Sequence, residues 1–217
     1  MAERFNAAVL KTAEPLRAPR VRIPLSPKCA GPTNVYLWDL LSYRDRFVRP
    51  VLPTLIETDD TDFEWMTGDV SASKRGLTLP PGGVDSNEVL VHVRAIARSL
   101  QGQQGHTNNW MIVAENEVVG LCGYKHWPSV DGRVDIGYSI SVSRRRRGHA
   151  TSAVAAIIAK AEADPRIFHI IAETAIDNHA SQRVLIKNGF QHIGTGIDPG
   201  NGERLLRWRV NVDGSRA

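Results

Sequence analysis

The chain has 217 residues, of which 42% are apolar and 23% charged, a composition typical of soluble globular proteins. Its length suits one domain with an appendage, or at most two small domains, and it can bury a core without disulfides or metals. No run of 18 apolar residues and no apolar leader is present, so we expect neither a membrane-spanning helix nor a secretory signal. The two cysteines, Cys29 and Cys122, form no disulfide framework and no metal motif, which favours a cytoplasmic, metal-free protein.

The positive charge is concentrated at the N-terminal end. The formal net charge is +4, yet residues 1–50 hold nine Lys or Arg against four Asp or Glu. Residues 51–217 hold eighteen against nineteen. A protein that is basic throughout would indicate nucleic-acid binding. A near-neutral body with one basic end does not, so we expect no nucleic-acid partner, and no membrane partner either.

The N-terminal segment is rich in proline. Five prolines fall within eighteen positions, namely Pro15, Pro19, Pro24, Pro27 and Pro32. This spacing forbids a helix and interrupts a central strand. We therefore predict that residues 1–49 are a basic, partly disordered extension with a short helix near residues 35–47, and that residues 50–217 form the folded domain.

Apolar periodicity predicts eleven helices and strands in the folded domain. In chain order they are a strand at 52–56, helices at 60–67 and 85–100, strands at 110–114, 118–124 and 133–142, a helix at 149–163, a strand at 167–174, a helix at 180–188, and strands at 190–195 and 205–212. We expect the glycines at 102 and 105 to end the second helix. Antiparallel strands dominate, with two crossover helices near the end, so the fold class is α+β or mixed α/β.

One loop carries the clearest functional signal. Residues 145–150, Arg-Arg-Arg-Gly-His-Ala, follow a predicted strand and open a predicted helix. Backbone amides at a helix N-terminus, with a glycine that permits close approach, form an anion site for a diphosphate or a phosphate. The Walker and dinucleotide-binding patterns are both absent. The alternative is that Arg144 and the three arginines after it form only a solvated charge run.

Three segments together resemble the GNAT N-acetyltransferases, in particular their RimJ/RimL-like branch. The loop at 145–150 is similar to the Arg/Gln-x-x-Gly-x-Gly/Ala acetyl-CoA loop of this family. Residues 178–190, from Asn178 to Phe190, resemble its Asn-x-x-Ser…Lys-x-Gly-Phe signature. Residues 135–138, Asp-Ile-Gly-Tyr, resemble a strand of that branch. The similarity covers roughly residues 50–212 and implies a mostly antiparallel, splayed sheet of about six to seven strands flanked by helices.

The resemblance also implies where acetyl-CoA, the cosubstrate, would bind. The strand ending near residue 142 would splay from the strand at 167–174, and pantetheine would occupy the gap. The implied contact residues are Ile140, Ser141 and Val142 for pantetheine; Arg145, Arg146, Arg147, Gly148, His149, Ala150 and Thr151 for the diphosphate; and Asn178 and Ser181 near the thiol. The reaction implied is direct acetyl transfer to a primary amine of an unidentified acceptor: a protein N-terminus, an amino acid or a small amine.

Two carboxylates are candidates for the catalytic base. Asp135 could accept the amine proton through a water, although the family often has Glu here; alternatively it is a strand carboxylate that pairs with an arginine. Glu173 could anchor the amine or act as the base, or it could be a structural carboxylate. An α-amine, with a pKa of about 8, would lose its proton more readily than lysine, near 10.4.

Ser181 is the candidate proton donor to the leaving thiolate, and it equally suits the first turn of a helix. Many family members have a tyrosine four residues later, where this chain has Leu185, so the proton comes from Ser181 or from solvent. We expect Tyr138 to pack in the sheet core. Residues 125–127 form either an exposed hairpin end or the rim of an acceptor pocket.

Several questions stay open at this level. We expect residues 68–84 to shape the acceptor site. Four aspartates nearby suit either a polyamine or a solvated helix start: Asp59, Asp60, Asp62 and Asp69. The resemblance also allows a homodimer. Two other functions compete, a non-catalytic acyl-CoA-binding regulatory module and nucleic-acid binding through the arginine run.

Overall fold

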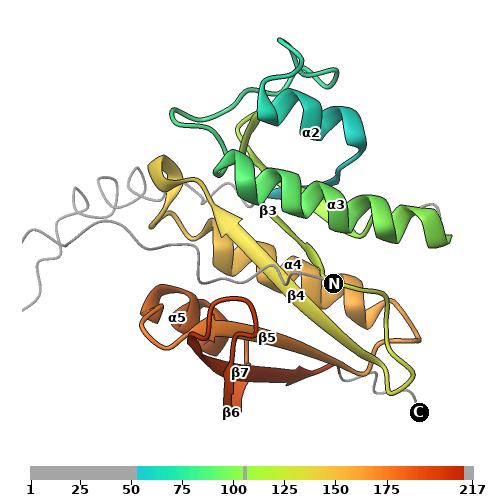
Figure 1. Cartoon of the computed structure of the whole chain (residues 1–217), viewed down its shortest axis with the longest axis vertical. Helices are drawn as coiled ribbons and strands as arrows, with labels where there is room; N and C mark the ends of the chain where they lie inside the picture. Colours follow the sequence, from blue (N-terminus) through green and yellow to red (C-terminus); the bar gives the residue numbers. More distant parts are fainter. Residues whose placement is uncertain (1–52, 105–106, 213–217) are drawn as a thin grey trace, which may run out of the picture. The chain divides into compact units, whose positions relative to one another are not determined.

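The computed structural model describes residues 53–104 and 107–212 (Figure 1). The extension predicted for residues 1–49, including its helix near 35–47, lies outside the described residues. The domain boundary at residue 50 therefore stays a prediction. In the described part of the chain, no helix is long and apolar enough to cross a membrane.

Seven strands form one sheet in the described residues. They are β1 (Thr54–Glu57), β2 (Asn109–Ala114), β3 (Glu117–Tyr124), β4 (Arg133–Ile140), β5 (His169–Ala175), β6 (Gln191–Ile197) and β7 (Arg204–Asn211), arranged in the order β1-β2-β3-β4-β5-β7-β6. Every neighbouring pair is antiparallel except β4 and β5, which are parallel. The predicted fold class, a mixed and mostly antiparallel sheet flanked by helices, is confirmed.

Helices cover both faces of the sheet. They are α2 (Asp60–Thr67), α3 (Asn87–Gln104), α4 (His149–Glu162) and α5 (His179–Lys187). One apolar cluster joins α2 and α3 to β2 and β3, whereas the other joins α4 and α5 to β2–β5 and β7. Helices α3 and α4 thus lie on opposite faces, as Figure 1 shows, and the alternation along β4 decides which face each side chain meets.

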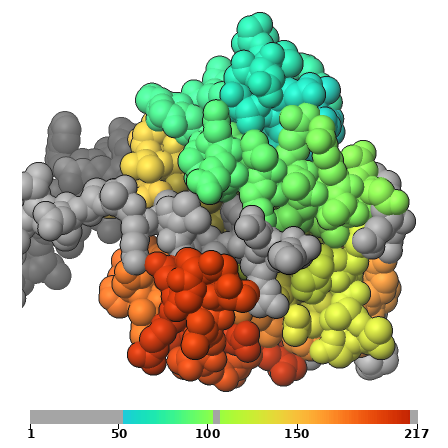
Figure 2. Space-filling view, viewed as in Figure 1, coloured from blue at the N-terminus to red at the C-terminus, as the bar shows by residue number. Residues whose placement is uncertain are grey.

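The side of the sheet that carries α2 and α3 is the one seen in Figure 2. Residues of α2 and α3, in turquoise and green, form its upper part, and residues of α5, β6 and β7, in orange and red, form its lower part. On β4, Asp135 belongs to this side, because it lies opposite Ile171 on β5, while its neighbours Val134 and Ile136 belong to the cluster with α4. We refer to the two sides as the α3 face and the α4 face.

Strands β4 and β5 pair only at one end. Their register runs from Arg133 opposite His169 to Ile136 opposite Ala172 and then stops. Beyond this point β4 stays with β3 as far as Ile140, and β5 stays with β7 as far as Ala175. The two strands therefore diverge and leave a gap, which Figure 1 shows widening away from their paired ends. This is the splayed sheet that the sequence predicted.

The predicted helices and strands agree with the described structure in type and order, but most of their ends differ by one or two residues. Two of the differences coincide with an identifiable feature of the chain. Helix α3 continues through Gly102 to Gln104, since one exposed glycine costs a helix only about 1 kcal/mol. Strand β4 ends at Ile140, two residues early, and a 3-10 turn at Val142–Arg144 follows. Val142 is consequently 76% exposed instead of packing in the core. At this point Ser141 Oγ donates a 2.8 Å hydrogen bond to the Gly83 carbonyl.

Candidate functional site

The first turn of α4 presents backbone N–H groups that no side chain caps. The helix begins at His149 after Gly148, whose φ of 85° lies in the left-handed region. Its first main-chain bond runs from Ser152 N to Gly148 O, so the amides before Ser152 have no partner within the helix. Left-handed φ values at Arg146 (63°) and Gly148 turn the loop so that successive amides converge. Such an arrangement at the positive end of a helix dipole binds anions.

The four arginines of this loop are not equivalent. Arg144 makes a two-pronged ion pair with Glu117 of β3, in which Nη2 donates to Oε1 at 2.9 Å. Arg145 Nε donates to the main-chain oxygen of Ile140 at 3.2 Å. Arg145, Arg146 and Arg147 are all exposed, whereas Arg144 is half-buried. Arg144 therefore anchors the loop to the sheet, and the three exposed arginines can meet an anion.

Alternate residues of β4 direct their backbone N–H and C=O groups toward its open edge. Lys125 N bonds to Asp135 O, and Ser141 N bonds to Val119 O, so the odd-numbered residues of β4 direct their backbone groups toward β3. Tyr138 and Ile140 direct theirs toward the gap. Of the three predicted pantetheine contacts, the structure brings Ile140 to the gap. Ser141 uses its carbonyl to accept from Arg144 N, and Val142 lies in the exposed turn.

Two hydroxyl groups meet across the gap on the α4 face. Asn178 is the N-cap of α5, and its Oδ1 accepts from Ser181 N at 3.1 Å. Ser181 Oγ lies 2.6 Å from the hydroxyl of Tyr138 on β4. Burial raises the pKa of Tyr138 to about 12, more than the bond to Ser181 lowers it.

Tyr138 packs against the core as predicted, but sequence reasoning missed its contact with Ser181. The available signal was a phenol on an otherwise apolar strand face, because buried tyrosine hydroxyls usually find a hydrogen-bond partner.

Asp135 is an ion-paired carboxylate on the α3 face. Its Oδ1 lies 3.0 Å from Arg133 Nε and 3.5 Å from His126 Nε2. Burial alone would raise the pKa of Asp135, but His126 and the positive charge of Arg133 hold it below its ordinary value. In turn, contact with Asp135 raises the pKa of His126 against the opposing effect of burial. The pairing with an arginine that the sequence offered as the structural alternative is present.

Glu173 lies on the same face, beyond the point where β4 and β5 separate. It is 9% exposed and accepts a 3.0 Å hydrogen bond from Arg207 Nε of β7, the residue directly opposite it. This cross-strand ion pair ties β5 to β7, which is the structural role anticipated as one of the alternatives for Glu173.

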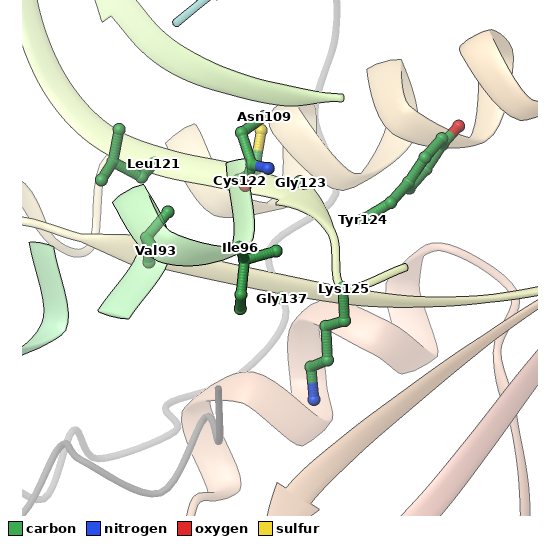
Figure 3. A pocket seen from close by; sticks show the side chains of 9 residues that line it. All are labelled: Val93, Ile96, Asn109, Leu121, Cys122, Gly123, Tyr124, Lys125 and Gly137. Carbon is green, nitrogen blue, oxygen red and sulfur yellow. The ribbon is translucent and has the colours of Figure 1, made fainter. Parts of the chain in front are cut away.

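A hollow separates α3 from β3 and β4 on the α3 face (Figure 3). Its volume is about 10 Å³, which is room for about one water molecule. Figure 3 shows Val93 and Ile96 reaching from α3 toward the strands, and the ring of Tyr124 pointing away. The lining residues are Val93, Ile96, Asn109, Leu121, Cys122, Gly123, Tyr124, Lys125 and Gly137. Gly137 follows Asp135 on the same face of β4, so the hollow lies next to that carboxylate.

Three of the four aspartates around α2 are ion-paired within the chain. Asp60 pairs with both Arg94 and Arg98 of α3, with a 2.7 Å contact from Arg98 Nε. The other two pairs are Asp59 with Lys74 and Asp62 with Arg75. Asp69 accepts a hydrogen bond from Thr67. The ion pairs of Asp59, Asp60 and Asp62 therefore hold α2 against α3 and against the loop that follows α2. These three carboxylates are not available to bind a cationic substrate.

Comparison with known proteins places the chain in a family. The model of the acetyltransferase (GNAT) domain matches residues 52–191. The uncharacterized N-acetyltransferase YjdG of Bacillus subtilis is 32% identical over 108 residues, which are 49% of this chain and 64% of that protein. Ribosomal-protein-serine acetyltransferase of Escherichia coli is 25% identical over 88 residues, which are 41% of this chain and 49% of that protein. The chain thus spans less than two thirds of either curated relative.

Solved structures share the fold at low sequence identity. A RimL ribosomal L7/L12 α-N-protein acetyltransferase in complex with coenzyme A has a TM-score of 0.57 at 19% identity, covering 76% of this chain and 97% of that chain. A spermidine N-acetyltransferase from Vibrio cholerae, in complex with CoA and spermine, has a TM-score of 0.52 at 13% identity, covering 74% and 95%. The family model matches more than half of this chain, and the neighbours have the same splayed sheet fold. The chain belongs to the acetyltransferase (GNAT) domain family.

Proposed function

We propose that the protein transfers the acetyl group of acetyl-CoA to a primary amine. One observation carries the proposal: an uncapped helix N-terminus directly follows a strand whose edge is open. The helix N-terminus is suited to a diphosphate, and the open strand edge is suited to the amide-rich pantetheine arm. Arg145, which reaches from one to the other, indicates that the two adjoin.

The residues present fit the cosubstrate. The amides of Arg146, Arg147, Gly148, His149, Ala150 and Thr151 would hold the diphosphate, with Arg145 joining them once it leaves the Ile140 carbonyl. Beyond Gly148 there is open space for a ligand, since a Cβ built there meets nothing within 4 Å. The backbone of Tyr138 and Ile140 would bond pantetheine as a neighbouring strand would. Acetyl-CoA supplies the activated acyl group as a thioester.

Asp135 would receive the amine proton through a water. It lies two residues before Gly137, which lines the hollow, and Arg133 and His126 favour its ionised form. Glu173 is tied to β7 by Arg207. A carboxylate with a lowered pKa is a weak base, so it suits an amine that is already partly neutral near pH 7. This favours an α-amine, with a pKa of about 8, over a lysine side chain near 10.4.

Ser181 would donate a proton to the departing thiolate. Its amide is fixed by the Asn178 cap, and its hydroxyl is held at the gap beside β4. Leu185, where many relatives place a tyrosine, is fully buried and carries no proton to give. The first acceptor we propose is a protein N-terminus, in keeping with the ribosomal-protein relatives. A polyamine needs unpaired carboxylates, and three of the four aspartates around α2, namely Asp59, Asp60 and Asp62, are ion-paired.

Isothermal titration of the full chain with acetyl-CoA and with desulfo-CoA tests the cosubstrate site. We expect micromolar affinity that Gly148→Trp weakens at least tenfold. Gly202→Trp is the matched control, because Gly202 also has a positive φ (71°) and open space around it. Equal loss in both variants, or no binding by the wild-type chain, would contradict the proposal.

An acetylation screen over peptides, amino acids and polyamines then separates an enzyme from a binding module. Acetyl-CoA binding without turnover on any amine would indicate a regulatory acyl-CoA-binding protein. Salt-sensitive binding of a DNA duplex in place of acetyl-CoA would indicate that the arginine loop contacts nucleic acid.

A further inference from the structure

Tyr138 and Ser181 form a side-chain hydrogen bond between the two sides of the gap. Tyr138 belongs to β4, Ser181 belongs to α5, and their oxygens lie 2.6 Å apart. An O–H···O bond of this length is at the short end of the usual range. The phenol also lies 3.3 Å from the main-chain oxygen of Ser181, so both contacts fall on one residue. This contact joins the open edge of β4 to the first turn of α5.

We propose that Tyr138 is a positioning residue that acts through Ser181: it fixes the serine hydroxyl toward the gap and resupplies its proton. The inference rests on the proposed function, in which Ser181 protonates the leaving thiolate. It adds a second hydroxyl, from β4, to a step that the sequence assigned to Ser181 or solvent alone.

The direction of the hydrogen bond follows from acidity. A phenol is a much stronger acid than an aliphatic alcohol, so in the proposed arrangement the Tyr138 hydroxyl donates to Ser181 Oγ at 2.6 Å in preference to the Ser181 main-chain oxygen at 3.3 Å. A serine hydroxyl has one hydrogen and two lone pairs. With one lone pair occupied by Tyr138, the serine hydrogen is left for another acceptor. In the first turn of a helix, an unheld serine hydroxyl can instead bond a nearby main-chain carbonyl. Tyr138 disfavours that alternative.

The proton balance of the step is as follows. The amine nitrogen forms a bond to the acetyl carbon, and its proton passes to Asp135 through water. The carbon–sulfur bond breaks, and the electron pair stays on sulfur. Sulfur takes the Ser181 proton, Ser181 takes the Tyr138 proton, and the phenolate regains a proton from solvent. The products are the acetylated amine and free CoA.

A double-mutant cycle tests whether Tyr138 acts through Ser181. Ser181→Ala should lower kcat about 100-fold and Tyr138→Phe about tenfold, each with little change in KM for acetyl-CoA. The double variant should match Ser181→Ala, because the phenol has no route to the thiolate without the serine. Thr174→Val is the matched control: it removes another buried hydroxyl that accepts a bond, from Trp208 Nε1 at 3.0 Å, and should leave kcat unchanged.

Binding of free CoA gives a readout that does not depend on turnover. A serine hydroxyl aimed at the sulfur stabilises the thiolate, so the affinity for CoA relative to desulfo-CoA should rise about tenfold between pH 7 and pH 9.5. Tyr138→Phe and Ser181→Ala should both reduce this rise to less than twofold. A purely structural role for Tyr138 would weaken both ligands equally at both pH values.

The outcomes separate the two proposals. If the wild-type chain binds no CoA or acetylates no amine, the proposed function fails and this inference fails with it. If the wild-type chain is active and Tyr138→Phe keeps its kcat and its pH-dependent CoA binding, only the role of Tyr138 is refuted. Should Tyr138→Phe not fold, 3,5-difluorotyrosine at position 138 replaces it. That residue keeps the hydroxyl but lowers its pKa, so kcat should fall at a lower pH than in the wild type, and an unchanged profile would refute the role.

Discussion

Arg145 Nε donates a hydrogen bond to the Ile140 carbonyl, 3.2 Å away, and so occupies an outward-facing group of the open β4 edge. The same guanidinium belongs to the loop whose amides are proposed to bind the diphosphate. It cannot serve both groups with the same N–H. We therefore propose that on cosubstrate binding Arg145 leaves the strand edge and joins the diphosphate.

This exchange predicts unequal effects of Arg145→Ala on two ligands. Loss of a charge-assisted bond should weaken binding of adenosine 3′-phosphate 5′-diphosphate, the part of CoA that lacks pantetheine, about tenfold. Binding of CoA should weaken only about threefold, because the Ile140 carbonyl becomes available to pantetheine. Calorimetric titration measures both constants. Equal weakening of the two ligands would mean that Arg145 and pantetheine do not share the carbonyl.

The Asp135–His126 contact predicts a pH window for stability. Asp135 has a lowered pKa, so its contribution is present above the unfolded value near 3.9 and is lost as the pH falls through the folded pKa. His126 has a raised pKa, so its contribution is present below about 6.5 and is lost as the pH rises through the folded pKa.

Asp135→Asn should therefore be most destabilising between about pH 4 and 6.5. His126 is 37% exposed, so solvent screening limits the difference in unfolding free energy between the wild type and Asp135→Asn to about 1 kcal/mol. Urea denaturation across pH 3–9 measures it, with the exposed Asp177→Asn as control. A difference that stays constant between pH 5 and 9 would show that Asp135 is stabilised by Arg133 and not by His126.

The sequence predicts this fold well where one element's own residues decide its structure. The apolar period defines helix α4 and strand β4, and the glycine after four arginines marks where α4 begins. The sequence does not predict contacts that depend on the register between strands far apart in the chain. Glu173 meets Arg207 because those two strand positions lie opposite each other, and no local pattern encodes that pairing. Alternation likewise places Tyr138 on the α4 face without indicating that α5 brings a serine to it.

The aspartate at the start of α2 is predicted to stabilise the helix pair and not to bind substrate. Asp60 bonds two arginines of α3, and these bonds hold the pKa of its carboxyl well below the usual range. Its side chain is 37% exposed, so we expect Asp60→Asn to cost only about 1 kcal/mol of unfolding free energy. Acetyl-CoA affinity and KM for spermidine should not change. A selective rise in KM for spermidine would instead place Asp60 in an acceptor site.

The closed end of the gap depends on Gly132. Its carbonyl accepts hydrogen bonds from Phe168 N at 2.8 Å and from His169 N at 3.2 Å, which join the start of β4 to the start of β5. Gly132 has a φ of 71°, and a Cβ built on it would overlap the Phe168 ring. Gly132→Ala therefore combines backbone strain with a clash and should cost about 2–3 kcal/mol.

Phe168→Ala separates those two contributions. Phe168 is 58% exposed, so Phe168→Ala alone should lower the free energy of unfolding only slightly. In the double variant it should remove the clash but not the backbone strain, and so restore about half of the stability that Gly132→Ala loses. Thermal and urea unfolding of the four chains give the cycle. Because this junction begins the pairing of β4 with β5, Gly132→Ala should also weaken CoA binding, and Phe168→Ala should partly restore it. Unchanged CoA affinity in a destabilised Gly132→Ala chain would mean that the width of the gap is fixed by α4 and α5 instead.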